Sequence, residues 1–279
     1  MSHGTPAPWR LVAALALSLV LLCCAGPAPG AGAAGLWEVT TCEVGKDEPG
    51  KLSFDVAVAR AGAAPEGGTV RFARDCVGEQ AVRLSRPVRL SAPSGGAPAG
   101  RWVTIDGGGR DVWLSGERRS AVLVATNVNL MVRGVTITAA SGSDPAARHG
   151  LVYEDDGTHT LEVVGARFLD NPGGGLRLRG TGGKGVRARV ASSTFAGNSA
   201  AWGAGIAADD VSAGLTVVDC TFVDNVAGVG AGLMVGATSR HRPQVTMANT
   251  SFLGNTTPGV GAGWAVRAGG VTMANVTVR

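Results

Sequence analysis

A repeated motif is the feature that most constrains the fold of this chain. The pattern Phe-x-x-Asn occurs four times, with successive phenylalanines 27, 27 and 30 residues apart: Phe168, Asn171, Phe195, Asn198, Phe222, Asn225, Phe252 and Asn255. Two further copies of the surrounding segment, at 130–137 and 271–278, carry Ile137 and Val278 where the others carry Phe. A repeat over six copies is typical of a solenoid, in which each repeat forms one turn of a stack.

Hydrophobicity within each copy predicts strands. Apolar residues stand seven and five positions before the Phe, and again two positions before it and at the Phe itself. Two stretches of alternation on either side of a phase break indicate two short strands that meet at a bend, not a helix. Stacked copies would bring the four phenylalanines into one interior column. The four asparagines would share one corner, where Asn tolerates left-handed backbone and can hydrogen-bond its own backbone or the next turn.

A glycine signature predicts a third strand in each turn. The segment Gly-Ala-Gly followed by Ile, Leu or Trp comes after each of the last three asparagines, with glycines Gly203, Gly205, Gly230, Gly232, Gly261 and Gly263. Glycine suits a sharp corner or a close approach of two backbones, and the apolar residue restarts an inward-facing strand. We therefore expect an all-β fold, a right-handed parallel β-helix.

A leucine-rich repeat is the structural alternative, because residues 217–225 match half of its consensus. That repeat needs Leu two places after the Asn, where this chain has Gly173, Ala200, Ala227 and Thr257. The β-helix is therefore favoured.

Composition excludes two other classes of protein. The chain has 44 Gly and 13 Pro in 279 residues, with 45% hydrophobic and 16% charged residues. So much glycine penalises long helices, while the apolar fraction is too high and the net charge of +4 too small for a disordered chain. The positive charge is spread without a run of Lys, so no nucleic-acid partner is expected.

The first 34 residues have the pattern of a secretory signal peptide. A short basic start is followed by an apolar run at 11–24 and by Ala31-Gly32-Ala33, a small-x-small cleavage site. We expect the mature chain to be secreted or on the cell surface, without a transmembrane span. In that oxidising environment we expect Cys42 and Cys76 to pair as a disulfide, on their proximity in sequence alone.

The mature chain divides into an N-terminal cap at 35–68 and a parallel β-helix at 69–279. A short helix at 54–65 would cover the open end of the solenoid, and residues 69–72 would form the first strand. Val278 stands where the repeat has Phe, and the sequence ends one residue later. This favours a truncated C-terminal end over an edge covered by a partner.

The paired motifs resemble those of a known family. Phe-x-x-Asn followed by Gly-Ala-Gly-(Ile/Leu/Trp) is similar to the Phe-x-x-Asn and Gly-Gly-Ala-(Ile/Leu/Val) motifs of the polymorphic outer membrane protein repeats, over about residues 160–279. The resemblance implies an extracellular parallel β-helix, at the outer membrane if the source is Gram-negative. The order Gly-Ala-Gly and the lack of a following autotransporter barrel depart from that family.

The sequence offers no catalytic constellation, no metal-ligand spacing and no cofactor motif. The acidic candidates are Asp155-Asp156, interpreted as a turn; Asp170, interpreted as a corner residue; and Asp209-Asp210, interpreted as a strand end in a solvated loop. His149, His159 and His241 are interpreted as surface residues in loops. We therefore expect no metal and no cofactor.

Two function classes remain open. The favoured one is a non-catalytic adhesion or interaction module, with surface glycans or other cell-surface proteins as partners. Its candidate contact residues are an exposed Trp202 and an outward basic stripe on neighbouring strands, formed by Arg177, Arg179, Lys184, Arg187 and Arg189. Such a stripe could hold acidic glycans, although ordinary solvation of an outer face is the favoured interpretation. The alternative is a polysaccharide lyase or glycoside hydrolase of the pectate-lyase-like β-helix type, which would need an acidic pair and a basic residue to converge on one face.

Overall fold

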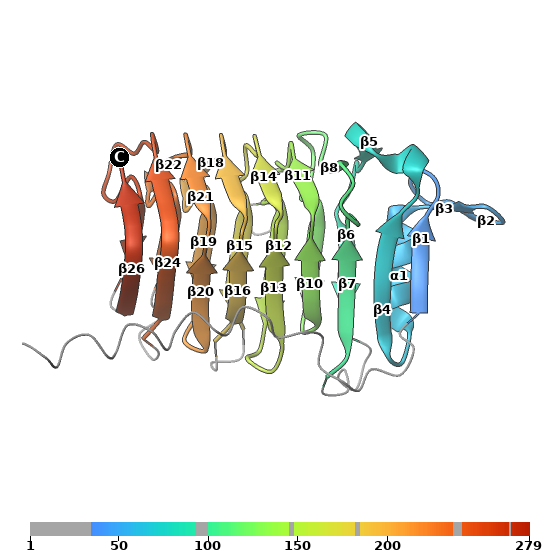
Figure 1. Ribbon diagram of the computed structural model, residues 1–279, viewed down its shortest axis with the longest axis horizontal. Helices are drawn as coiled ribbons and strands as arrows, with labels where there is room; N and C mark the ends of the chain where they lie inside the picture. Colours follow the sequence, from blue (N-terminus) through green and yellow to red (C-terminus); the bar gives the residue numbers. More distant parts are fainter. Residues whose placement is uncertain (1–34, 93–99, 145–147, 182–184, 237–241, 268) are drawn as a thin grey trace, which may run out of the picture. The chain divides into compact units, whose positions relative to one another are not determined.

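The computed structural model describes residues 35–92, 100–144, 148–181, 185–236, 242–267 and 269–279, so the predicted leader lies outside the described residues. The described chain is a parallel β-helix of about six turns, as predicted (Figure 1). The second to sixth copies of the motif lie directly on one another, because Leu161 pairs with Ala188, Ala188 with Leu215, Leu215 with Val245 and Val245 with Val271.

Three faces run along the stack, and each repeat contributes strands to them. The first face consists of β1 (Gly35–Val39), β4 (Gly67–Phe72), β7 (Trp102–Asp106), β10 (Asn129–Arg133), β13 (Thr160–Val164), β16 (Arg187–Ala191), β20 (Gly214–Val218), β24 (Gln244–Leu253) and β26 (Gly270–Val278). The second face consists of β5 (Gly78–Arg83), β8 (Val112–Ser115), β11 (Val135–Thr138), β14 (Arg167–Leu169), β17 (Thr194–Ala196) and β21 (Thr221–Val223), and continues into the second part of β24.

The third face consists of β6 (Val88–Ser91), β9 (Leu123–Thr126), β12 (Leu151–Asp155), β15 (Leu176–Gly180), β19 (Ile206–Asp209), β23 (Leu233–Gly236) and β25 (Trp264–Val266). Two small sheets stand outside this scheme: β18 (Ser199–Trp202) with β22 (Val226–Val229), and β2 (Asp47–Glu48) with β3 (Lys51–Leu52). In the last turns, β18 and β22 form an extra ledge between the second and third faces.

The bends between faces are made by left-handed residues at fixed places. The residue three positions before each Phe, or its Ile or Val equivalent, has φ between 47° and 61°: Gly134, Gly165, Ser192, Asp219, Asn249 and Asn275. A second left-handed residue follows each Phe by two positions, and here Asp170 and Asp224 alternate with Gly197 and Gly254. The interpretation of Asp170 as a corner residue is confirmed, since its φ is 50°.

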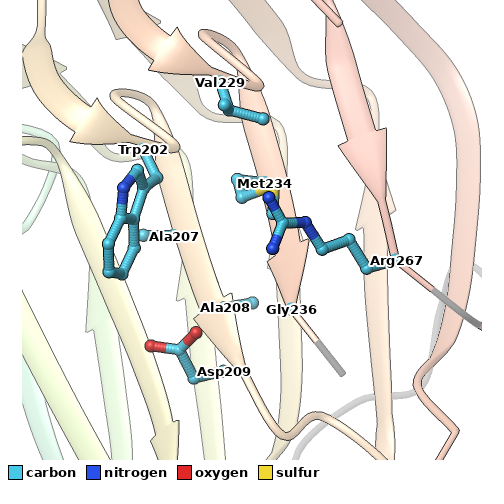
Figure 2. Close-up of a pocket in the computed structure, with 8 residues that line it drawn as sticks. All are labelled: Trp202, Ala207, Ala208, Asp209, Val229, Met234, Gly236 and Arg267. Carbon is cyan, nitrogen blue, oxygen red and sulfur yellow. The ribbon is translucent and has the colours of Figure 1, made fainter. Parts of the chain in front are cut away.

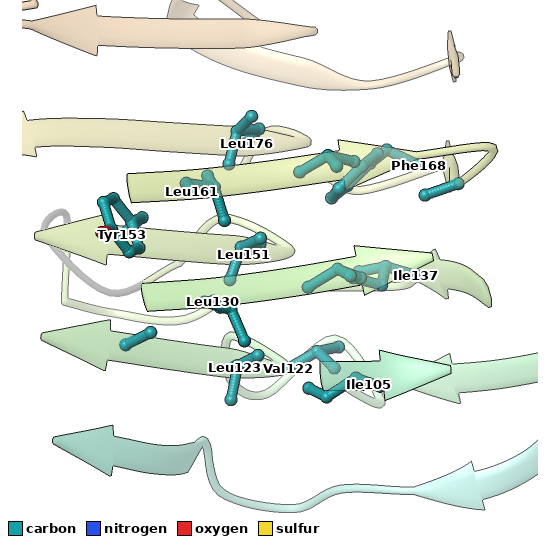
Figure 3. Packing of buried hydrophobic residues seen from close by; sticks show 14 of the residues in the cluster. Ile105, Val122, Leu123, Leu130, Ile137, Leu151, Tyr153, Leu161, Phe168 and Leu176 are labelled. Carbon is teal, nitrogen blue, oxygen red and sulfur yellow. The ribbon is translucent and has the colours of Figure 1, made fainter. Parts of the chain in front are cut away.

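The interior is filled by columns of apolar side chains. Leucines of the first face, such as Leu130 and Leu161, point toward leucines of the third face, such as Leu151 and Leu176 (Figure 3). The rings of Phe168, Phe195, Phe222 and Phe252 stack with centroids 4.8, 4.8 and 4.7 Å apart. This spacing equals the separation of neighbouring strands.

The four asparagines form a buried ladder beside the ring column. Asn198 is fully buried, and its side chain makes four hydrogen bonds. Its Nδ2 donates to the carbonyl of Phe168 and to Oδ1 of Asn225, both at 2.9 Å. Its Oδ1 accepts from the backbone N–H of Asn171 at 3.2 Å and from Nδ2 of Asn171 at 2.8 Å. Asn225 repeats these contacts with Asn255.

The Gly-Ala-Gly corner uses its two glycines for different reasons. The first glycine is left-handed, with φ of 54° at Gly203, 59° at Gly230 and 71° at Gly261. The third position of the motif needs glycine because there is no room for a side chain. A Cβ on Gly205 would lie 2.3 Å from the carbonyl oxygen of Gly232 and 2.7 Å from Cδ1 of Phe222. Gly232 has the same relation to Gly263 and Phe252.

The predicted capping helix is present as α1 (Phe54–Ala63), against β1 and β4 (Figure 1). Phe54 stacks on Phe72 at 5.7 Å and so covers the first interior layer. The prediction that the strands begin at 69–72 is wrong, because β1 precedes the helix and pairs in parallel with β4. Its short sequence carries none of the repeat motif, so periodicity gave no signal there. A short 3-10 helix, Arg74–Cys76, follows β4.

Candidate functional site

A groove lies on the outer surface of the third face, in its C-terminal half. Alternate side chains of each strand point away from the interior. The pairing register aligns Arg177, Ala207 and Met234 in one outward row, and Arg179, Asp209 and Gly236 in the next. Arg267 extends this second row, since its backbone N–H donates to the carbonyl of Val235 at 2.9 Å.

The ledge formed by β18 and β22 turns this surface into a hollow of about 300 Å³, here called the Trp202 groove. Its lining comes from four strands and the residue after β25: Trp202, Ala207, Ala208, Asp209, Val229, Met234, Gly236 and Arg267. Ala207 of β19 and Met234 and Gly236 of β23 form the floor. Figure 2 shows Trp202 and Arg267 on opposite sides, with Met234 between them in this view and Asp209 at one end.

The aromatic wall of the groove is open to solvent. Trp202 is 54% exposed, as the sequence predicted, whereas Met234 on the floor is 7% exposed. A concave site with an apolar floor and a few charged groups at its ends is the usual form of a ligand site.

Charged side chains surround the groove in a defined arrangement. Arg177 Nη2 lies 3.0 Å from Asp209 Oδ2, and Arg179 Nη1 lies 3.2 Å from Glu154 Oε1. Within the described part of the chain, Arg267 forms no ion pair. Among the described residues, the groove therefore contains one ion-paired carboxylate and one guanidinium without an ion-pair partner.

The predicted basic stripe is wrong. Arg177 and Arg179 lie on β15 of the third face, whereas Arg187 and Arg189 lie on β16 of the first face. Lys184 is outside the described residues. Residues close in sequence are separated because the chain turns a corner between these two strands, and the two arginines of β15 are ion-paired with acidic neighbours.

The acidic candidates do not converge. Asp209 ends β19 as predicted, but Asp210, expected in a solvated loop, is only 6% exposed. Asp155 is fully buried at the end of β12. Asp170 stands at a corner of the second face.

One group of side chains has atoms that metals use, although the sequence predicted no metal. Donor atoms of Asp155, Asp156 and His159 all lie within 4.8 Å of one another. The buried Asp155 carboxylate already accepts hydrogen bonds from the backbone N–H of Gly157 at 2.8 Å and of His159 at 3.2 Å, and its Oδ1 is 2.9 Å from His159 Nδ1. These contacts hold the turn together and explain the group without a metal.

The interpretation of the histidines as surface residues is wrong for His149 and His159. His149 is 2% exposed, and the His159 side chain is 10% exposed. His241 lies outside the described residues. The ring of His149 packs on the next turn, where a Cβ on Gly174 would lie 2.5 Å from its Cδ2. Only the glycine of that neighbouring turn leaves room for the ring, and sequence spacing does not reveal such a contact.

We expect His149 to make the protein less stable in acid. Burial, followed by the positive charges of Arg177 and Arg148, lowers the pKa of His149 to about 3. Since the unfolded chain binds the proton with the ordinary pKa near 6.5, the stabilisation is complete above pH 6.5 and is lost as the pH falls toward 3. At pH 5 the expected loss from this residue is about 2 kcal/mol. Urea unfolding at pH 7 and pH 5 measures it.

The matched variant for this experiment is His149→Gln, which stays neutral. It should lose about 2 kcal/mol less than the wild type between pH 7 and pH 5. Equal losses in the two proteins would contradict the assignment to His149.

Cys42 and Cys76 are neighbours in space. Their Sγ atoms lie 2.7 Å apart, and both are free thiols in this structure. Burial, followed by the contact with Cys42, raises the pKa of Cys76 to about 12. The disulfide therefore stays a prediction, with the geometry in its favour.

Oxidation of this pair is expected to raise the free energy of unfolding by about 2–4 kcal/mol, because the cross-link closes the loop between the two cysteines in the unfolded chain. Urea unfolding with and without reductant tests this, with the loss of two hydrogens followed by mass spectrometry. Cys42→Ser should abolish the redox dependence. Stability that depends equally on reductant in that variant would contradict the pairing.

No protein-family model matches the chain, and no curated protein matches it. The fold is therefore shown by the structure itself, while the resemblance to the polymorphic outer membrane protein repeats rests on the motifs alone. Among the described residues, no helix has the length and apolar character needed to cross a membrane.

The sequence missed Arg267 as a site residue, although a usable signal was present. Asp209, Gly236 and Arg267 each follow the apolar residue of the Gly-Ala-Gly signature by three positions. The repeat register alone thus puts them in one row.

Proposed function

We propose that this chain is a secreted or cell-surface interaction module that binds its partner, a surface glycan, in the Trp202 groove without catalysing a reaction. The observation that carries the proposal is the exposed indole of Trp202 on the wall of a hollow with an apolar floor. Aromatic side chains in such positions supply much of the contact energy of binding sites. Secretion is supported by the signal-peptide pattern of residues 1–34.

The chain from residue 34, which forms one compact unit, is the protein to test. Its retention on immobilised neutral and acidic glycans would be measured. Trp202→Ala is expected to weaken binding about tenfold, which corresponds to a loss of 1.4 kcal/mol of contact free energy. Leu36→Ala removes another exposed apolar side chain, 61% exposed and on β1 at the N-terminal end of the stack, and should leave retention unchanged. Equal effects of the two variants would contradict a role for the groove.

Polysaccharide cleavage is the second candidate function. Glu154 and Asp209 both stand on the outer side of the third face with Arg177 and Arg179, and glycoside hydrolysis uses a pair of carboxylates. Each carboxylate is ion-paired with an arginine, which favours binding over acid–base chemistry. The test follows the release of unsaturated products or reducing ends from polysaccharides, with and without calcium. A release that Asp209→Asn abolishes would show that the protein is an enzyme instead.

A further inference from the structure

The Trp202 groove has an asymmetry of charge that indicates the class of glycan. Three charged side chains stand at or beside it: Arg177, Asp209 and Arg267. The carboxylate of Asp209 is bound by Arg177 at 3.0 Å. One positive charge, that of Arg267, is then left over, and it faces Trp202 across the hollow (Figure 2).

We propose that the groove selects a glycan whose sugar residue carries an anionic group, a carboxylate or a sulfate. Arg267 binds the anion, and Trp202 packs against the ring. This inference rests on the proposed function and names the chemistry of its ligand.

The geometry of each side chain suits that division of roles. A guanidinium group is planar and always charged, and it binds carboxylate or sulfate oxygens through two parallel hydrogen bonds. The indole offers a flat apolar surface of the kind that the C–H face of a sugar ring covers. The volume of about 300 Å³ is at the lower end of the range for small-molecule pockets, so a short stretch of a glycan fits better than a folded protein surface.

Replacement of Asp209 tests the proposal, because the direction of the change in affinity depends on the charge of the ligand. Its carboxylate repels a bound anion and also engages Arg177. Replacing Asp209 with Asn removes that repulsion. A groove built for a neutral or cationic sugar would instead use Asp209 as a hydrogen-bond acceptor, so the same change would weaken binding.

The experiment measures the affinity of the chain from residue 34, and of its Arg267→Gln, Asp209→Asn and Trp202→Ala variants, for three probes. Hyaluronan carries carboxylates, dextran sulfate carries sulfates, and dextran is neutral. We expect wild-type affinity to be higher for one or both anionic probes than for dextran, and to fall as salt rises, because exposed charges are screened. Arg267→Gln should weaken anionic binding about tenfold, and Asp209→Asn should strengthen it severalfold. Far-UV circular dichroism and the urea midpoint confirm that each variant is folded.

The outcomes separate this inference from the function on which it rests. If Trp202→Ala loses binding while Arg267→Gln binds the anionic probes as the wild type does, the groove remains the binding site and the proposed selectivity for an anionic sugar is overturned. Weaker anionic binding in Asp209→Asn, or no wild-type preference for an anionic probe over dextran, would also overturn it. Unchanged binding of every probe in Trp202→Ala would overturn the proposed function itself. The relative affinities of hyaluronan and dextran sulfate decide whether the anion is a carboxylate or a sulfate.

Discussion

Replacing Phe222 with alanine is expected to lower the free energy of unfolding by about 3–5 kcal/mol, as for other buried phenylalanines. The ring is fully buried and lies between Phe195 at 4.8 Å and Phe252 at 4.7 Å. The change would leave a cavity at the centre of the column, and backbone packed on both sides cannot collapse to fill it. Urea unfolding followed by circular dichroism measures the loss.

Phe222→Leu is the graded control, because it keeps most of the buried volume and should cost less than the alanine variant. Phe252→Ala gives a second comparison at the end of the ring stack, where one neighbour is Val278 instead of Phe. Hydrogen exchange should show the largest loss of protection in the turns that contact the substituted residue, since each repeat of a solenoid touches only its neighbours. A loss near zero for Phe222→Ala would contradict the role of the ring column.

Asn198→Ala is expected to cost about 4 kcal/mol, because each buried polar group left without a partner costs roughly 1–3 kcal/mol. The substitution removes the acceptor of the Asn171 backbone N–H and the donor to the Phe168 carbonyl, both inside the stack. It also removes the side-chain contacts to Asn171 and Asn225. The free energy of unfolding from urea titration checks the prediction.

Asn198→Asp tests which half of the amide matters. A carboxylate can still accept from Asn171, but it cannot donate to the Phe168 carbonyl and it places a charge in the interior, so it should destabilise at least as much. The matched control is Asn275→Gly, an exposed corner position with φ of 52° that glycine adopts freely. A change beyond about 0.5 kcal/mol is not expected there. Similar losses of unfolding free energy for Asn198→Ala and Asn275→Gly would show that the buried ladder does not contribute the expected stability.

These two sets of residues could be found in the sequence because stacking repeats the same environment in every turn. An interior position of one turn is an interior position of the next, so Phe recurs beside Phe, and Asn beside Asn. The same logic accounts for the two glycines of the Gly-Ala-Gly corner, one for a left-handed φ and one for a close approach to the Phe of the next turn. The capping helix was visible because helical residues interrupt the alternation typical of strands.

The errors share one physical cause, which is that neighbours across turns or corners are not neighbours in sequence. His149 is buried because Gly174 stands in the turn beside it. The arginines at 177–179 and 187–189 are separated because a corner lies between their strands. Strand β1 was missed because it pairs with β4 although α1 lies between the two strands in the sequence.

The sequence by itself determined the parallel β-helix, its register and the inward or outward direction of most side chains, because a repeated pattern can bury its apolar positions only by stacking on itself. It also determined that Trp202 is exposed. Only the tertiary structure decided the groove, since that hollow requires the ledge of β18 and β22 beside β19, β23 and the residue after β25. The choice of ion-pair partners, such as Arg177 and Asp209, depends on the distances between side chains of neighbouring turns. Those distances are set only in the folded stack.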